Sequence, residues 1–196
     1  MGSLVLTGDT SGSVTVAVPA VAGSNTATIG AATGTHYPFT AGTAVASTSG
    51  TSIDFTNIPS WVKRVTVMFS TVSNTGTGNM LVQIGTGSSP TTSGYFSIGA
   101  FNGSTSNGST SSTAGFIINT DNASDEFSGA MTISLVNPST NTWVASYAMA
   151  RKQGTFYYSA TGGGTVALAG TLGMVRLTTP AGSATFDAGS INILYE

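Results

Sequence analysis

The residues that could carry acid–base or nucleophilic chemistry are few in this chain of 196 residues. His36 is the one histidine, so a Ser–His–Asp triad would have to use it. No Gly-x-Ser-x-Gly elbow occurs, and the absence of cysteine excludes a thiolate nucleophile and Cys-based zinc and iron–sulfur sites. We therefore predict no catalytic residues and no enzyme. We interpret His36 as a structural residue, with an ion shared by several copies at a symmetry axis as the alternative.

The acidic residues suggest two further kinds of chemistry. Asp121, Asp125 and Glu126 offer the oxygen ligands that Ca²⁺ prefers, but their spacing is not that of an EF-hand. The spacing favours an ordinary acidic turn, so we predict no metal and no cofactor and keep these three residues as candidate ligands. Two carboxylates ~5–9 Å apart could also hydrolyse a glycosidic bond. A polysaccharide-degrading enzyme is thus the remote alternative.

Aromatic residues beside polar loops form the main candidate site. A glycan presents CH patches and hydroxyls, which aromatic faces and Asn, Asp or Thr side chains can bind. The candidate ligand-binding residues are Tyr95, Phe96, Phe101, Asn102, Asn107, Tyr157 and Tyr158. These aromatic side chains are the more exposed candidates, with Phe101 bordering a loop, and the sequence leaves burial of about half of them in the core as the alternative. Trp61 and Trp143 are expected in the core.

Alternating apolar and polar residues indicate the elements that must position these side chains. Val65, Val67 and Phe69 alternate with polar or flexible residues, and Met131 and Ile133 follow the same period of two. The 26 glycines would interrupt long helices. We therefore predict an all-β fold of antiparallel strands, with Gly162, Gly163 and Gly164 in a turn.

The stretch Asn102–Gly115 reads NGSTSNGSTSSTAG and contains the unit NGST twice. Asn-Gly pairs favour the positive φ angles of tight turns. This pattern predicts a long surface loop or a loose hairpin end that faces solvent or a ligand.

The chain changes character near residue 50. Residues 1–50 have no tryptophan, lysine or arginine and contain mostly small side chains, so they cannot fill a core alone. We expect them to form an intertwined, stalk-like β segment that oligomerises with identical chains. Residues 51–196 carry both tryptophans and all the basic residues. They are long enough to bury the core of one β-sandwich, jelly-roll-like in type.

Charge excludes two classes of partner. Five Lys and Arg residues against seven Asp and Glu residues give a net charge of −2, with no basic stripe for nucleic acid. No apolar run approaches the ~20 residues of a membrane-spanning helix, so we expect no membrane insertion. Charged residues amount to 6% of the chain. So few charges offer little repulsion between neighbours, which suits a tight assembly.

Two parts of the sequence resemble virion proteins of tailed bacteriophages. The first is SLVLTGDTSGSVTVAVPAVAGSNTATIGAATG (Ser3–Gly34), which resembles a small-residue module of tail fibres. The second is SIDFTNIPSWVKRVTVMF (Ser52–Phe69), together with the later stretches Met80–Gly87, Ser139–Ala150, Gly170–Thr179 and FDAGSINILYE (Phe186–Glu196). These resemble a domain that often follows that module in fibre-like proteins. Roughly residues 96–130 lie outside the resemblance.

The resemblance implies a homotrimeric virion structural protein at the tail or capsid surface. Its partners would be itself, other virion proteins and a host surface glycan. Full tail fibres usually begin with a domain that docks to the tail, whereas this sequence begins at the small-residue module. It is therefore either a fragment or a short complete protein, and the alternative to a fibre or spike component is a capsid decoration protein.

Overall fold

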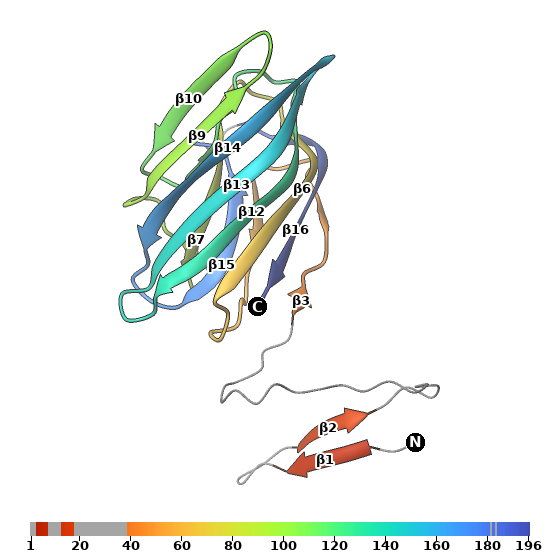
Figure 1. Ribbon diagram of the computed structural model, residues 1–196, viewed down its shortest axis with the longest axis vertical. Coiled ribbons are helices and arrows are strands. Elements are labelled where there is room, and N and C mark those ends of the chain that lie inside the picture. The colour runs from red at the N-terminus through yellow and green to blue at the C-terminus, as the bar shows by residue number, and fades with distance from the viewer. Residues whose placement is uncertain (1–2, 8–12, 18–38, 181, 183) are drawn as a thin grey trace. The chain divides into compact units, whose positions relative to one another are not determined.

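The computed structural model describes residues 3–7, 13–17, 39–180, 182 and 184–196. The chain divides into two compact units, Met1–His36 and Tyr37–Glu196. In the first unit, β1 (Ser3–Thr7) and β2 (Ser13–Ala17) pair as an antiparallel hairpin (Figure 1). His36 lies outside the described residues, and so does most of the stretch for which an intertwined stalk is predicted.

Every regular element among the described residues is a β-strand, and all the pairings are antiparallel, which confirms the predicted all-β sandwich (Figure 1). The nine-stranded sheet has the order β10 (Asn107–Ser112), β9 (Phe96–Asn102), β14 (Phe156–Ala167), β13 (Thr142–Gln153), β12 (Asp125–Asn137), β6 (Arg64–Asn74), β16 (Phe186–Tyr195) and β3 (Thr40–Ala41), with β4 (Val45–Ala46) also paired to β16. The five-stranded sheet has the order β11 (Phe116–Ile118), β7 (Met80–Thr86), β15 (Leu172–Thr178) and β5 (Ser52–Phe55), with β8 (Ser89–Pro90) paired to β7.

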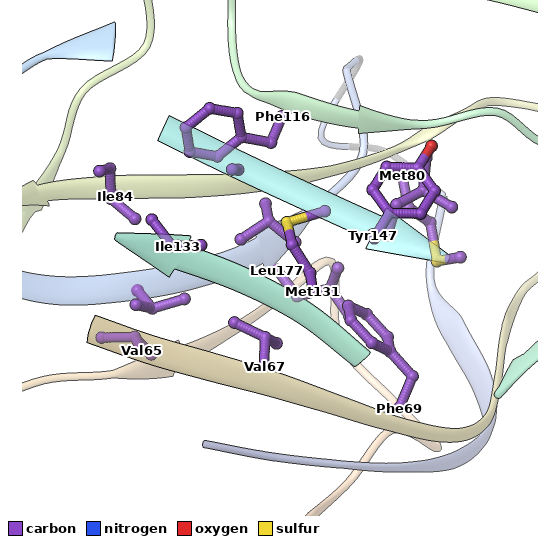
Figure 2. Packing of buried hydrophobic residues seen from close by; sticks show 14 of the residues in the cluster. Val65, Val67, Phe69, Met80, Ile84, Phe116, Met131, Ile133, Tyr147 and Leu177 are labelled. Carbon is purple, nitrogen blue, oxygen red and sulfur yellow. The ribbon is translucent and has the colours of Figure 1, made fainter. Parts of the chain in front are cut away.

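The core lies between these two sheets, as Figure 2 shows. Val65, Val67 and Phe69 project from β6 in the alternation that the sequence predicts, and all three are buried. They pack with residues of the facing sheet such as Ile84 and Leu177. Trp143 is buried, as predicted. Trp61 is half-buried and packs against the edge of the core.

The second unit begins earlier than the boundary predicted at residue 51. It starts at Tyr37, and β3 and β4 both pair with β16 of the sandwich. Ser47 is fully buried, and its hydroxyl donates to the carbonyl oxygen of Ala188 at 2.7 Å. Residues 39–50 therefore belong to the sandwich, because their backbone completes the edge beside β16.

The three consecutive glycines lie in the middle of β14, so the predicted turn is wrong. Their role is spatial. A Cβ atom on Gly162 would lie 2.6 Å from ring carbons of Tyr147 on the neighbouring strand, and a Cβ atom on Gly99 of β9 would lie 2.6 Å from the Tyr147 hydroxyl. The missing side chains make room for the Tyr147 ring on the inner face of the sheet.

Candidate ligand-binding site

The stretch predicted as a surface loop is largely a β-hairpin. Strand β10 pairs with β9 in an unbroken register from Asn107 opposite Asn102 to Ser112 opposite Ser97. Residues 103–106 form the turn, where the amide of Gly103 donates to the carbonyl oxygen of Ser106 at 3.0 Å. The hairpin-end alternative is therefore the correct one, and β10 is the terminal strand of the nine-stranded sheet.

A pocket of about 390 Å³ lies where β9 begins and β10 ends. Its lining residues are Tyr95, Phe96, Ser97, Ile98, Ser111, Ser112 and Thr113. The side chain of Phe96 is 76% exposed and that of Ile98 is 52% exposed, although both are large and apolar. The pocket therefore combines an exposed aromatic ring, an aliphatic side chain and hydroxyl groups, and no charged residue lines it.

Strand β9 turns Phe96 and Ile98 outward for an identifiable reason. The alternate residues Ser97, Gly99 and Phe101 face inward and are buried. The Ser97 hydroxyl accepts a hydrogen bond from the amide of Ile117 at 3.0 Å, and Gly99 lies against β11 and Tyr147. The close approach of β11 and the Tyr147 ring leaves room only for small side chains there, so Phe96 and Ile98 point to solvent.

Tyr95 is buried rather than exposed, which corrects the expectation for this residue. Its hydroxyl donates to the carbonyl oxygen of Ile84 at 3.1 Å and accepts from the amide of Ile84 at 2.9 Å. Burial raises the pKa of this hydroxyl above its ordinary value, and the hydrogen bond opposes that rise only in part. Tyr95 thus lines the pocket and ties it to β7, and its hydroxyl is already bonded to protein.

Phe101 and Tyr158 are also buried, contrary to expectation, because they enclose a buried arginine. The guanidinium carbon of Arg151 lies 3.8 Å from the centre of the Phe101 ring and 4.9 Å from that of Tyr158. Such cation–π contacts stabilise a desolvated arginine. Phe101 is a core residue, and it supports the one fully buried cation among the described residues.

The three candidate metal ligands are instead partners of basic residues. Asp121 and Asp125 both form ion pairs with Arg151, and the Arg151 Nε atom lies 2.9 Å from Asp125 Oδ1. Glu126 pairs with Lys152 at 3.1 Å. In the described ranges no group of three or more His, Cys, Asp or Glu side chains could hold a metal ion. The acidic turn anchors the connection between the two sheets.

The remaining candidates, Asn102, Asn107 and Tyr157, are exposed, but they lie away from the pocket. Phe96 is opposite Thr165 of β14, whereas Asn102 is opposite Ser159. At ~3.3 Å per residue the two ends of β9 are about 20 Å apart. The predicted ligand-binding residues therefore lie at separate places in the structure. Of those at the pocket, Phe96 is the one whose side chain is exposed.

Sequence reasoning missed Ile98 and the hydroxyl group of Thr113. A signal was available, because Phe96, Ile98 and Ala100 alternate with Ser97 and Gly99. That alternation identifies a strand, but by itself it favours the larger residues as the inward set.

Comparisons with protein-family models, with curated proteins and with solved structures found no match for this chain. Over the described ranges, no helix is long and apolar enough to cross a membrane.

Proposed function

We propose that this chain is a structural component of a bacteriophage virion, a homotrimeric tail-fibre or spike part whose β-sandwich presents a recognition surface to the host. The resemblance of Ser52–Phe69 and Phe186–Glu196 to fibre-like proteins supports the virion assignment. The pocket beside Phe96 is the observation that supports recognition. It lies in the part of the chain that the resemblance does not cover, as expected for a surface that differs between hosts.

The chemistry of the pocket fits a neutral glycan. The exposed Phe96 ring can stack on the CH face of a sugar, and the hydroxyls of Ser111, Ser112 and Thr113 can bond to sugar hydroxyls. No charged residue lines the pocket, so an acidic sugar would find no counter-ion there. Neutral hydrogen bonds contribute only ~0.5–1.5 kcal/mol each, so single-site affinity is low. Three copies on one particle raise avidity by ~10²–10⁴ if ligands are dense.

A glycan-array screen of the full chain tests the recognition surface. We expect binding to neutral host glycans that Phe96→Ala weakens at least tenfold. Tyr157→Ala is the matched control, because Tyr157 is an aromatic residue of similar exposure, 72%, near the opposite end of the same sheet. The affinity of the Tyr157→Ala variant for these glycans should differ less than twofold from that of the unsubstituted chain. Loss of binding in Tyr157→Ala alone, or no binding to any host glycan, contradicts the proposed site.

Imaging of the assembled virion tests where this chain lies in the particle. Density for this chain at the tail or fibre tip supports the fibre assignment. Density on the capsomers would replace it with the capsid decoration protein, the second candidate. The scarcity of charged residues, 6% of the chain, also suits that candidate, because few charges repel a neighbouring subunit. A reducing-end assay on host polysaccharide tests the enzyme alternative, for which we expect no release of sugar.

A further inference from the structure

The pocket lies on only one side of the two exposed apolar residues that line it. On that side is β10, where Ser111 lies opposite Ile98 and lines the pocket. On the other side is β14, where Thr165 lies opposite Phe96 and Gly163 lies opposite Ile98. Figure 1 shows β10, β9 and β14 side by side in one sheet. Phe96 and Ile98 therefore form an apolar ridge between two neighbouring strands.

The far side of this ridge carries a second group of hydroxyls. Thr161 on β14 and Ser146 on β13 are exposed, and their hydroxyls have no hydrogen-bond partner among the residues that the structure describes. Thr165 adds a third hydroxyl, which donates to the carbonyl oxygen of Trp143 at 2.9 Å and can still accept a hydrogen bond. Ser146 lies opposite Gly163, which has no side chain to separate it from the ridge in that row.

We infer that the site binds a linear, neutral oligosaccharide of at least three units, which runs across β10, β9 and β14 instead of ending in the pocket. Its central unit stacks its CH face on the apolar ridge. The unit on one side bonds to the pocket hydroxyls, and the unit on the other side bonds to those of Thr161 and Ser146. The inference rests on the proposed function, because it extends the same glycan site.

The strand spacing supports a chain of several units. Neighbouring strands lie ~4.8 Å apart, so β10 and β14 are about 10 Å apart, and β10 and β13 are about 14 Å apart. A single sugar ring is too short to reach hydroxyls on both sides of the ridge, whereas successive units of a chain can do so. Phe96 is 76% exposed, so its ring is open to solvent beyond the side that lines the pocket.

Calorimetric titration of the full chain tests the length of the ligand. The probes are linear oligomers of glucose, of galactose and of N-acetylglucosamine, each from one to four units long. In a series that binds, we expect the three-unit oligomer to bind at least tenfold more tightly than the single sugar. A chain with only one occupied side of the ridge would show no such gain.

Two double variants test which hydroxyls produce the gain. Ser146→Ala with Thr161→Ala should weaken binding of the three-unit oligomer at least fivefold and leave binding of the single sugar unchanged. Thr132→Ala with Ser134→Ala is the matched control, because these hydroxyls lie on β12, one strand farther from the ridge, in the rows of Ser146 and Val144. The control should change neither affinity, and circular dichroism should confirm the fold of both variants.

Cysteine labelling locates the bound oligomer, because the chain contains no cysteine. Ser146→Cys places a thiol on the far side of the ridge, and Ser88→Cys places one in the exposed turn between β7 and β8 of the other sheet. A saturating three-unit oligomer should slow maleimide labelling of Ser146→Cys at least fivefold. A saturating single sugar should not slow it, and neither ligand should affect Ser88→Cys.

The outcomes separate this inference from the proposed function. Equal affinity for one and three units, with loss of binding in Phe96→Ala, overturns the inference and leaves the pocket as the whole site. Full reactivity of Ser146→Cys under a bound three-unit oligomer also overturns it, because the chain would then run in another direction. Absence of binding by every oligomer overturns it as well, and the glycan-array screen then decides the proposed function separately.

Discussion

The hydroxyl of Tyr147 donates a hydrogen bond of 2.8 Å to the carbonyl oxygen of Ile117. Tyr147 projects from β13 of the nine-stranded sheet, and Ile117 lies in β11 of the five-stranded sheet. The bond therefore joins the two layers through the core, and the ring occupies the space that Gly99 and Gly162 leave free. Buried carbonyl groups need such partners, because an unpaired one costs about 1–3 kcal/mol.

Tyr147→Phe should lower the free energy of unfolding by about 1–3 kcal/mol, because it removes the partner of the Ile117 carbonyl and leaves the ring in place. Urea titration of the full chain measures the change. Tyr157→Phe is the control, since Tyr157 is exposed, and its effect should stay within ~0.5 kcal/mol. Equal effects in the two variants would show that the bond between the sheets contributes nothing.

The buried tyrosines also predict how stability depends on alkaline pH. Burial raises the pKa of Tyr95 and Tyr147 above the ordinary value of 10.0. The native state therefore holds these protons more tightly than the unfolded state. Their contribution to stability is complete below pH 10 and is lost as the pH rises toward the native pKa values. In that range the free energy of unfolding falls by about 1.4 kcal/mol per pH unit for each tyrosine.

Denaturation curves between pH 9 and pH 11.5, collected for each variant, measure that slope. Tyr95→Phe or Tyr147→Phe should each remove about half of it, whereas Tyr157→Phe should leave it unchanged. A slope that stays the same in both buried variants would show that other groups cause the alkaline loss.

Phe101→Ala should cost about 3–5 kcal/mol, comparable with Trp143→Ala, because both rings are buried. The sequence alone predicts a loss below ~1 kcal/mol for Phe101, on the expectation that it borders a loop. Phe96→Ala is the control on the same strand and should change stability by less than ~0.5 kcal/mol. Thermal and urea unfolding distinguish these values, and a small loss in Phe101→Ala would contradict the buried cation–π arrangement.

Arg151→Met should lower the free energy of unfolding by about 3–5 kcal/mol, because it leaves the buried carboxylate of Asp125 without its cation. Methionine keeps apolar volume between the two rings, so the loss reports the charge. In the double variant with Asp125→Asn the total loss should be smaller than the sum of the two single losses. Additive losses in this cycle would mean that the two groups do not interact.

Gly162→Ala should destabilise the sandwich by about 1–3 kcal/mol, since the added methyl group meets the Tyr147 ring. Gly78→Ala is the control, because no atom lies within 4 Å of a Cβ atom there. Unfolding of both variants in urea provides the comparison. Equal stability of the two variants would contradict the close packing of Tyr147 against β14.

The sequence by itself determined the all-β class, several of the strands and much of the core. The period of two across Val65, Val67 and Phe69 requires one buried face wherever the strand lies, and Trp143 is buried for the same reason. The lack of charge on β14 is likewise a property of the sequence alone. These features are local, because each depends only on the residues of one strand.

The tertiary structure decided which face of β9 is buried and which charges meet. The alternation in β9 offers Phe96 and Ile98 on one side and Ser97 and Gly99 on the other, and hydrophobicity alone favours burial of the first pair. The reverse occurs because β11 and the Tyr147 ring approach so closely that only small residues fit. Similarly, Asp121 meets Arg151 only because the connection between the two sheets folds back onto β13. Both outcomes depend on neighbours that are distant in the sequence, and no pattern within a single strand specifies them.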